Sequence, residues 1–189
     1  MWNIAILASG SGSNAENIAK YFSKHPRVKI ALIATENPNA MVLERAKRLE
    51  LPSYRFTMEE FKNGKVLRKF IDMNIDFIVL AGFLKMVPPE MVKQFHNRIV
   101  NIHPALLPMY GGKGMYGDRV HKVVIAAGET ESGITIHYVN EHYDEGDIIF
   151  QARCPVMSND TPETLAQRVH MLEWEYYPKV IETLLEQLA

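Results

Sequence analysis

The chain has one cysteine, no long apolar run and almost no net charge, and each absence excludes a class of protein. Its 21 Lys and Arg residues nearly balance its 22 Asp and Glu residues. This balance leaves no basic stripe of the kind that binds a phosphate backbone, and we interpret the cluster 45–48 as a solvated helix face. No apolar run approaches the roughly 20 residues that cross a bilayer. Nucleic acids and membranes are therefore not expected partners.

The single cysteine, Cys154, has no partner for an internal disulfide. The chain also enters the apolar run 2–8 directly, without the basic segment or cleavage site of a leader peptide. Both features favour a cytoplasmic protein. Apolar segments are spread evenly over the 189 residues, so we predict a single domain, 1–189, with a well-buried core.

Short apolar runs alternate with segments of helical period, which is the pattern of β-α units around a parallel sheet. The expected strands are 3–8, 28–34, 53–56, 77–80 and 99–102, and the expected helices are 14–23, 40–50, 58–73 and 89–95. The strands are apolar almost throughout, as in a sheet that is covered on both faces. The first half of the chain is therefore predicted to be doubly wound.

The pattern changes in the second half. Apolar and polar residues alternate over 134–139, and a further run at 148–153 predicts an antiparallel hairpin. Thr161 and Pro162 predict the N-cap and first residue of a long helix, which Pro178 is expected to kink or divide. The predicted fold class is α/β, a doubly wound, mostly parallel sheet with an antiparallel C-terminal hairpin and a long C-terminal helix.

A glycine-rich loop, 9–14, joins the first strand to the first helix. Its glycines permit a tight turn, and the N–H groups at the start of the helix would face an anion such as a phosphate. An ordinary turn with Ser13 as N-cap is an alternative. The loop also matches a dinucleotide fingerprint, with Glu36 as its ribose-binding acid. No nicotinamide half-site or Walker lysine accompanies it, so we favour a small phosphorylated molecule.

Asn101 and His103 stand where a predicted strand ends in a proline-pinned loop. Residues i and i+2 of a strand point to the same side, so an amide donor and an imidazole would face one reacting centre. Pro104 biases His103 toward extended backbone and holds it at the strand exit. A donor for an oxyanion beside a group that moves a proton is what acyl-type transfer needs.

Asp144 lies in the turn between the two late strands and is the candidate carboxylate partner of His103. We expect its charge to favour the imidazolium and to raise the pKa of His103. From spacing alone, a solvated turn is the better interpretation of this segment. His103, His137 and Asp144 could also form a metal triad, but no ligand spacing supports it. His137 is more typical of a residue that supports the site residues or of a satisfied core residue.

Taken together in order, five segments make the chain resemble the phosphoribosylglycinamide formyltransferase family. They are 9–14, 80–87, 101–108, 132–139 and the turn around Asp144. The resemblance covers nearly the full length and implies the formyltransferase fold. It further implies that 10-formyltetrahydrofolate, as co-substrate, gives its formyl group directly to the amine of 5-phosphoribosylglycinamide in de novo purine biosynthesis. A tetrahedral intermediate is implied, and neither a metal nor a covalent enzyme intermediate.

The resemblance also implies a role for individual positions. The implied catalytic residues are Asn101, His103 and Asp144, with His137 behind them; the phosphate-binding residues are Gly12, Ser13 and Asn14; the ribose-binding residues are Glu173 and, beside it, His170; and the folate-lining residues are Leu84, Lys85, Met86, Val87, Asn101, Asn140, Glu141, His142, Tyr143 and Asp144. The chain departs from the family pattern at Ala105, where serine is usual, at Lys85, where arginine is common, and at His170, where glutamine is expected. Its segment 109–117 replaces a shorter loop.

Two other formyl enzymes share the asparagine, histidine and aspartate. Methionyl-tRNA formyltransferase is expected to carry a further C-terminal RNA-binding domain, and formyltetrahydrofolate hydrolase an N-terminal regulatory domain; the chain shows neither. A phosphosugar-sensing or dinucleotide-binding module would explain the glycine loop but would leave Asn101 and His103 without a task. We therefore expect small-molecule substrates as partners, and a monomer or a homodimer.

Overall fold

The structure, a computed structural model, describes all 189 residues, which form two compact units, 1–101 and 102–189. The first unit contains β1 (Trp2–Leu7), α1 (Ser13–Phe22), β2 (Val28–Thr35), α2 (Val42–Arg48), β3 (Ser53–Arg55), α3 (Met58–Lys62), α4 (Lys65–Asp72), β4 (Phe77–Leu80) and α5 (Pro89–Gln94). The strand β5 (Ile99–His103) runs from the first unit into the second. The second unit contains α6 (Asp118–Ala126), β6 (Glu131–Tyr138), β7 (Ile148–Pro155) and α7 (Pro162–Gln187). A single domain stays a prediction.

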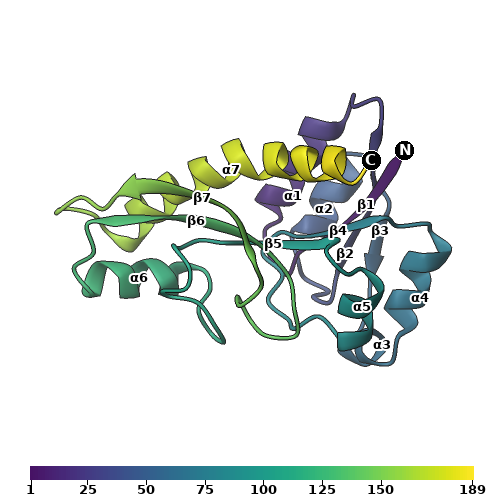
Figure 1. The fold of residues 1–189 in the computed structure, drawn as a ribbon, viewed down its shortest axis with the longest axis horizontal. Coiled ribbons are helices and arrows are strands. Elements are labelled where there is room, and N and C mark those ends of the chain that lie inside the picture. Colours follow the sequence, from purple (N-terminus) through teal and green to yellow (C-terminus); the bar gives the residue numbers. More distant parts are fainter. The chain divides into compact units, whose positions relative to one another are not determined.

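The first unit is built on parallel strands in the order β3-β2-β1-β4-β5 (Figure 1). Most of their side chains are buried, because helices cover a doubly wound sheet on both faces. The order reverses between β1 and β4, whose last residues, Leu7 and Leu80, are paired. Ligands of open α/β sheets bind at the carboxyl ends of strands beside such a reversal. The loops after β1 and β4 are therefore in the right place for a site.

The predicted helix 58–73 is wrong as a single element. It is divided into α3 and α4 at Asn63–Gly64, where Gly64 takes a left-handed φ of 85° as the N-cap of α4. Thr57 begins α3 with a capping box to Glu60, so each half has its own start signal. The helix α6 was not predicted, since it follows a glycine-rich segment whose sequence reads as loop.

The second unit contains the antiparallel pair β6-β7, which follows β5 in the strand order and confirms the predicted hairpin. Along this pair runs α7, for which Thr161 is the N-cap and Pro162 the first residue, as predicted (Figure 1). Pro178 does not divide α7. Its neighbours Tyr177 and Ile181 are fully buried, and their packing offsets the missing hydrogen bond. The predicted α/β fold class is confirmed.

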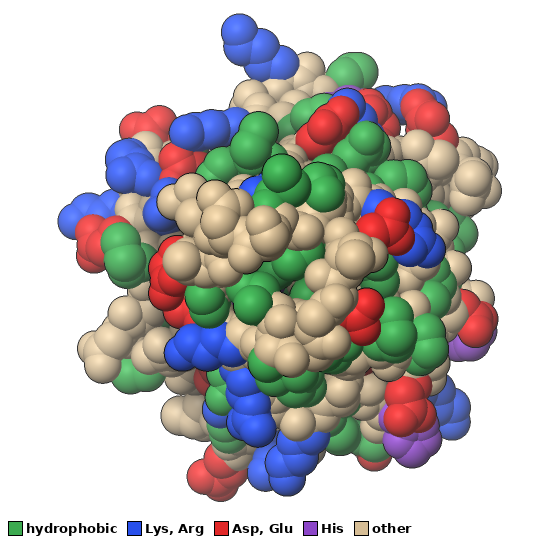
Figure 2. Space-filling view, turned by 90° about the vertical axis from the view of Figure 1, so that its left-hand side faces the viewer, with side chains coloured by type: hydrophobic (Ala, Val, Ile, Leu, Met, Phe, Trp, Pro, Cys, Tyr) green, Lys and Arg blue, Asp and Glu red, His purple; other side chains and the backbone are tan.

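No helix combines the length and the apolar character that crossing a membrane requires. On the face drawn in Figure 2, Lys and Arg side chains lie among Asp and Glu side chains and do not gather into one stripe. This face therefore shows no basic stripe of the kind that binds a phosphate backbone.

Candidate functional site

The loop after β1 presents an open helix start. Gly12 is the N-cap of α1, in a left-handed conformation with φ 73°, and no side chain caps the first turn. The alternative with Ser13 as N-cap is therefore wrong, because Ser13 is already the first helical residue. A Cβ on Gly12 would lie 2.4 Å from Cγ2 of Val42, so only glycine fits between the loop and α2. The uncapped N–H groups suit an anion.

Three basic residues pair with Glu16 in the first turn of α1, and one of them also contacts this loop. The Arg45 Nε donates to the Ser11 carbonyl at 2.6 Å, and its guanidinium pairs with Glu16 on α1. Lys20 and Arg48 also pair with Glu16, at 2.7 and 2.9 Å. Hydrogen bonds from Lys20 and Arg45 lower the pKa of Glu16 to about 2. Three cations against one carboxylate favour a phosphate here, and Arg45 is not part of a solvated face.

Glu36 does not occupy the position that a dinucleotide needs. Its Oε1 accepts a hydrogen bond of 2.7 Å from the Ser9 hydroxyl, and its Oε2 is buried without a hydrogen-bond partner. A ribose-binding acid has to present its oxygens to both hydroxyls of the sugar. Because one oxygen is engaged and the other is shielded, the geometry speaks against the dinucleotide interpretation.

Asn101 and His103 both lie on β5, two residues apart, and so on one side of that strand. The His103 side chain is buried, and its Nε2 lies 2.7 Å from the Tyr110 carbonyl oxygen. A carbonyl only accepts hydrogen bonds, so Nε2 carries a proton; Nδ1, which then carries one only in the imidazolium, is the nitrogen that faces a carboxylate. Asn101 also has hydrogen-bond or electrostatic partners.

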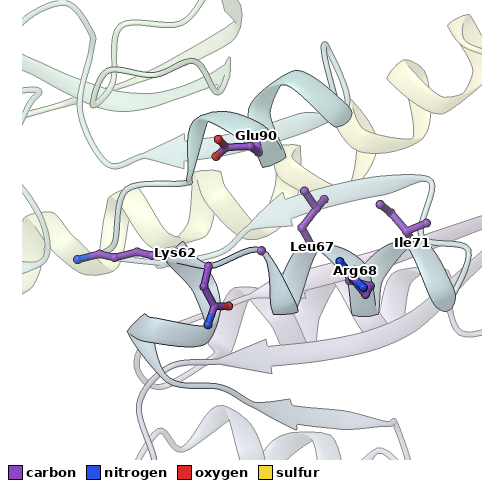
Figure 3. Close-up of a pocket in the computed structure, with 7 residues that line it drawn as sticks. Lys62, Leu67, Arg68, Ile71 and Glu90 are labelled. Carbon is purple, nitrogen blue, oxygen red and sulfur yellow. The ribbon is translucent and has the colours of Figure 1, made fainter.

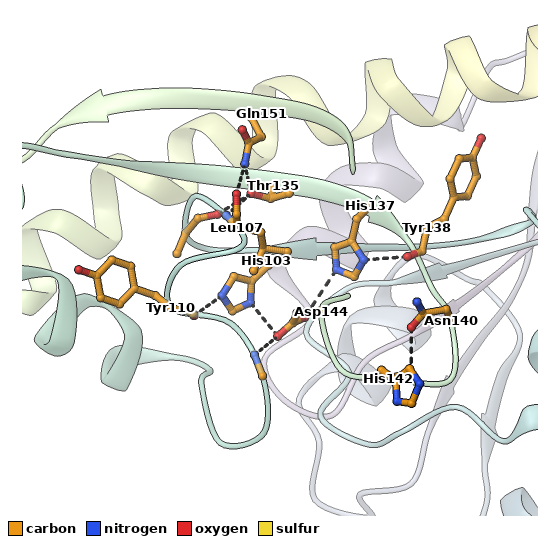
Figure 4. A network of polar contacts seen from close by, with 12 residues as sticks. His103, Leu107, Tyr110, Thr135, His137, Tyr138, Asn140, His142, Asp144 and Gln151 are labelled. Atoms are coloured by element: carbon orange, nitrogen blue, oxygen red, sulfur yellow. Dashed lines mark hydrogen bonds and ion pairs between the residues drawn. The ribbon is translucent and has the colours of Figure 1, made fainter. Parts of the chain in front are cut away.

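Asp144 is that carboxylate (Figure 4). Its Oδ2 lies 3.5 Å from Nδ1 of His103, and its Oδ1 lies 3.6 Å from Nε2 of His137. The Gly112 N–H donates to Oδ2 at 2.9 Å, and the backbone of Asp144 is left-handed with φ 56°. Aspartate adopts this region more readily than most residues do, as in tight turns. The structure thus brings together His103, Asp144 and His137.

Burial and charge act on His103 in opposite directions. Desolvation lowers its pKa and is the largest influence, while the charge of Asp144 and the hydrogen bond to Tyr110 raise it. The net pKa of His103 lies below its ordinary value, so the expected rise is wrong. The effect of Asp144 has the expected sign, but the low-dielectric surroundings outweigh it. His103 is therefore neutral at pH 7.

The same balance keeps Asp144 charged. Burial raises its pKa, but hydrogen bonding from His137, the charge of His103 and the Gly112 N–H together bring the pKa below its ordinary value. His137 is oriented by a second contact, because its Nδ1 lies 2.8 Å from the Tyr138 carbonyl oxygen. No three His, Cys, Asp or Glu side chains are arranged to hold a metal ion.

Side chains of β6 and β7 hold the loop after His103 in place through hydrogen bonds. The Thr135 hydroxyl donates to the Ala105 carbonyl at 2.7 Å and accepts from the Leu107 N–H at 2.9 Å. The Gln151 amide donates to the Leu107 carbonyl at 3.0 Å (Figure 4). These hydrogen bonds hold the chain that leaves β5 against β6 and β7.

Glu173 and His170 form a second pair, on α7. The Glu173 side chain is buried, and its Oε2 lies 2.8 Å from Nδ1 of His170. This hydrogen bond raises the pKa of His170, although burial opposes it. The His170 ring also stacks on Trp174, with centroids 6.1 Å apart.

The family is decided by the comparisons with known proteins. The model of the formyl transferase family matches residues 2–181. A phosphoribosylglycinamide formyltransferase of Bacillus subtilis is 35% identical over 98% of this chain and 95% of its own length. The chain belongs to the phosphoribosylglycinamide formyltransferase family.

Solved structures of this family share the fold. The phosphoribosylglycinamide formyltransferase of Anaplasma phagocytophilum matches with a TM-score of 0.89 and 32% identity over 98% of this chain and 88% of that one. The phosphoribosylglycinamide formyltransferase of Streptococcus pneumoniae matches with a TM-score of 0.86 and 35% identity. The match covers 98% of this chain and 99% of that one. Chloroplastic members from Arabidopsis thaliana and Vigna unguiculata are 41% and 42% identical, and this chain spans 65% and 61% of their lengths.

The residues expected to line a folate pocket in this family differ in exposure. The side chains of Leu84, Lys85 and Met86 are exposed, whereas that of Val87 is buried and leaves only its backbone for a ligand. In the turn before Asp144, the Asn140 amide oxygen accepts from the His142 N–H at 2.8 Å. Glu141 and His142 are exposed, and Asn140 and Tyr143 are half-buried.

One groove contains none of the predicted site residues. It has a volume of about 380 Å³ and is lined by Lys62, Asn63, Gly64, Leu67, Arg68, Ile71 and Glu90, between α4 and α5 (Figure 3). The family resemblance assigns no role to it. Sequence reasoning also missed Arg45, which contacts the phosphate loop, and its partner Glu16. Only the basic run 45–48 gave a signal, and contacts between residues about 30 positions apart cannot be seen from it.

Proposed function

We propose that this protein transfers the formyl group of 10-formyltetrahydrofolate to the amine of 5-phosphoribosylglycinamide. The observation that carries the proposal is the pairing of His103 with Asp144 at 3.5 Å, in a chain of this family. A neutral imidazole backed by a charged carboxylate is suited to accept a proton and to hold it.

The phosphorylated substrate binds through both of its ends in this proposal. The phosphate accepts hydrogen bonds from the N–H groups of Ser13 and Asn14, where Gly12 leaves the helix start open. The ribose hydroxyls donate to Glu173, and His170 orients that carboxylate through its hydrogen bond. The cations around Glu16 add a favourable field for the phosphate.

The reaction is an acyl transfer without an enzyme-bound intermediate. The amine nitrogen forms a bond to the formyl carbon, and the carbonyl oxygen becomes an oxyanion that Asn101 and His103 stabilise. The amine then loses a proton, the bond from the formyl carbon to the folate nitrogen breaks, and that nitrogen takes up a proton. His103 relays this proton, with Asp144 stabilising the imidazolium while it exists.

The nitrogen of His103 that serves the substrate is Nε2, because Nδ1 faces Asp144. In the structure Nε2 donates to the Tyr110 carbonyl. When the reacting groups bind, the substrate replaces this carbonyl as the partner of Nε2. Nε2 then accepts a proton in the tautomer whose single ring proton is on Nδ1, toward Asp144. The segment that follows Tyr110 then also has to keep Gly112 on Asp144, since that N–H helps to hold the carboxylate charged.

The folate co-substrate lies along Leu84, Lys85, Met86 and the backbone of Val87, and along the turn Asn140–Asp144. Exposed Leu84 and Met86 supply apolar contact for its rings, and backbone groups of the turn meet the pterin. The absence of a metal from the reaction, a cytoplasmic location and a monomer or homodimer stay predictions.

An absorbance assay for the folate product tests the function. Purified protein is incubated with 10-formyltetrahydrofolate, once with glycinamide ribonucleotide and once without it. Product that depends on the amine supports the transferase, and product without the amine indicates a hydrolase. A titration with glycinamide ribonucleotide should saturate, whereas NAD should not bind, in line with the position of Glu36.

A further inference from the structure

Ser9 connects the two loops that leave β1 and β4. Its hydroxyl donates to Glu36 Oε1 at 2.7 Å and accepts from the Leu84 N–H at 3.0 Å. Its backbone N–H donates to the Gly82 carbonyl at 3.0 Å, and its carbonyl accepts from the Asn37 amide at 2.9 Å. One residue thus makes four hydrogen bonds, to the ends of β2 and β4, immediately before the phosphate loop.

The side-chain bonds and the backbone bonds of Ser9 have different consequences. The backbone bonds fix the path of the chain into the phosphate loop and do not depend on the side chain. The hydroxyl has a single proton, which it donates in the hydrogen bond to Glu36. Its oxygen lone pairs are therefore left to accept a hydrogen bond from the Leu84 N–H. Glu36 therefore sets the direction in which Ser9 holds the first residue of the folate-lining segment.

Glu36 engages only one of its two carboxylate oxygens. Its Oε2 is buried without a hydrogen-bond partner, and an unsatisfied buried acceptor is unfavourable. Sites that keep such groups are typically those where a fixed geometry is needed. The other oxygen of this carboxylate accepts from the Ser9 hydroxyl, and that hydroxyl accepts from the Leu84 N–H, so the geometry that Glu36 fixes is that of Leu84.

We infer that Ser9 and Glu36 are positioning residues for the folate co-substrate, acting through the backbone of Leu84. The inference builds on the proposed function, since the folate role of Leu84 belongs to it. Leu84 is exposed although it is apolar, and its direction depends on its backbone. Without the Ser9 hydroxyl, the Leu84 N–H loses its partner and the segment Leu84–Val87 loses its anchor at the end of β1.

Binding measurements on Ser9→Ala test the inference. The dissociation constant for tetrahydrofolate should rise about tenfold, the effect of one lost hydrogen bond at a partly buried donor. The dissociation constant for glycinamide ribonucleotide should change by less than about threefold, because the backbone bonds of Ser9 remain. Both constants are measured by calorimetry. In the same way, KM for the folate co-substrate should rise, whereas KM for glycinamide ribonucleotide should stay near that of wild type.

Two further variants and a control sharpen the test. Glu36→Ala should also raise the constant for tetrahydrofolate, whereas Glu36→Gln, whose amide oxygen still accepts from Ser9, should restore it to within about threefold of wild type. Ser23→Ala is the matched control, because it removes an exposed serine hydrogen bond, to the Lys20 carbonyl, at the opposite end of α1 from the phosphate loop. It should leave both constants unchanged.

The outcomes separate the inference from the function on which it builds. An unchanged tetrahydrofolate constant in Ser9→Ala, or an equal rise of both constants, overturns the positioning role. Glu36→Gln behaving like Glu36→Ala overturns the hydrogen-bond relay. If Ser9→Ala does not fold, the two Glu36 variants decide alone. Wild-type protein that binds no tetrahydrofolate contradicts the proposed function itself.

Discussion

The Nδ1 of His103 lies 3.5 Å from the Oδ2 of Asp144, and only 4% and 11% of their side chains are exposed. Burial lowers the pKa of His103, while the carboxylate and the Tyr110 carbonyl raise it. A neutral imidazole at rest thus stands beside a charge that favours its protonated form. Such a pair accepts a proton readily only while the carboxylate is charged.

Asp144→Asn removes that charge and keeps the shape of the side chain. Because Asp144 raises the pKa of His103 against the effect of burial, the variant should lower this pKa further. Turnover requires neutral His103, so the activity should persist to a lower pH in the variant. The acid limb of the pH profile should therefore move to lower pH. The rate on the plateau should fall by about 100-fold or more, since the imidazolium is no longer stabilised.

Asp147→Asn is the matched control, an exposed acid three residues along the same turn. It should leave the pH profile and the rate unchanged. NMR titration of the His103 ring in both variants separates the pKa change from the loss of rate. A profile and a rate that are unaffected in Asp144→Asn would show that the role assigned to this carboxylate is wrong.

Asn101→Ala and His103→Ala test the two groups on β5. Each oxyanion donor is worth roughly 3 to 4 kcal/mol, so either variant should reduce turnover by about 100-fold or more. The dissociation constant for glycinamide ribonucleotide should stay near that of wild type, because the phosphate and ribose contacts lie elsewhere. Single-turnover rates at saturating substrate, together with calorimetry, check both parts. A loss of binding equal to the loss of rate would contradict a role in the chemical step.

Local signals in the sequence were sufficient for most of the fold. Strands 77–80 and 99–102 are apolar runs with turn residues at both ends, and the structure places β4 and β5 there, with β5 one residue longer. Thr161 and Pro162 carry their helix-start signal in two neighbouring residues. The division at Gly64 and the helix α6 were missed. In both places a glycine precedes the helix, and from sequence a glycine can equally indicate a loop or the start of a helix.

The site was only partly predictable. Asn101 and His103 are two residues apart, so strand geometry alone relates them. The partnership of His103 with Asp144 spans 41 positions, and family resemblance supplied it. The direction of the His103 pKa depends on burial, which no spacing gives. Likewise, the contacts of Ser9 with Glu36 and Leu84 follow from the sheet order, and this order becomes visible only once the chain is folded.

Gly12→Ala and Gly10→Ala form a matched pair in the phosphate loop. A Cβ on Gly12 meets Val42 at 2.4 Å in a left-handed backbone, so the variant should lose about 2 to 4 kcal/mol of unfolding free energy and bind glycinamide ribonucleotide weakly. A Cβ on Gly10 meets nothing within 4 Å, and stability should change by less than about 0.5 kcal/mol. Urea unfolding and calorimetry measure both. Equal effects would mean that the loop does not need the left-handed turn.

His170→Gln tests the ion pair with Glu173 and introduces the residue expected from the family. The hydrogen bond to Glu173 raises the pKa of His170, so the folded protein binds this proton more tightly than the unfolded chain. The stabilisation is present below the unfolded-state pKa of about 6.5 and is lost as the pH rises through the folded-state pKa. The difference in unfolding free energy between wild type and variant should therefore be larger at about pH 5.5 than at about pH 8.5. In a Glu173→Gln background, His170→Gln should show no such pH dependence, because the partner charge is gone. A difference that grows with pH would mean that burial, and not Glu173, governs His170.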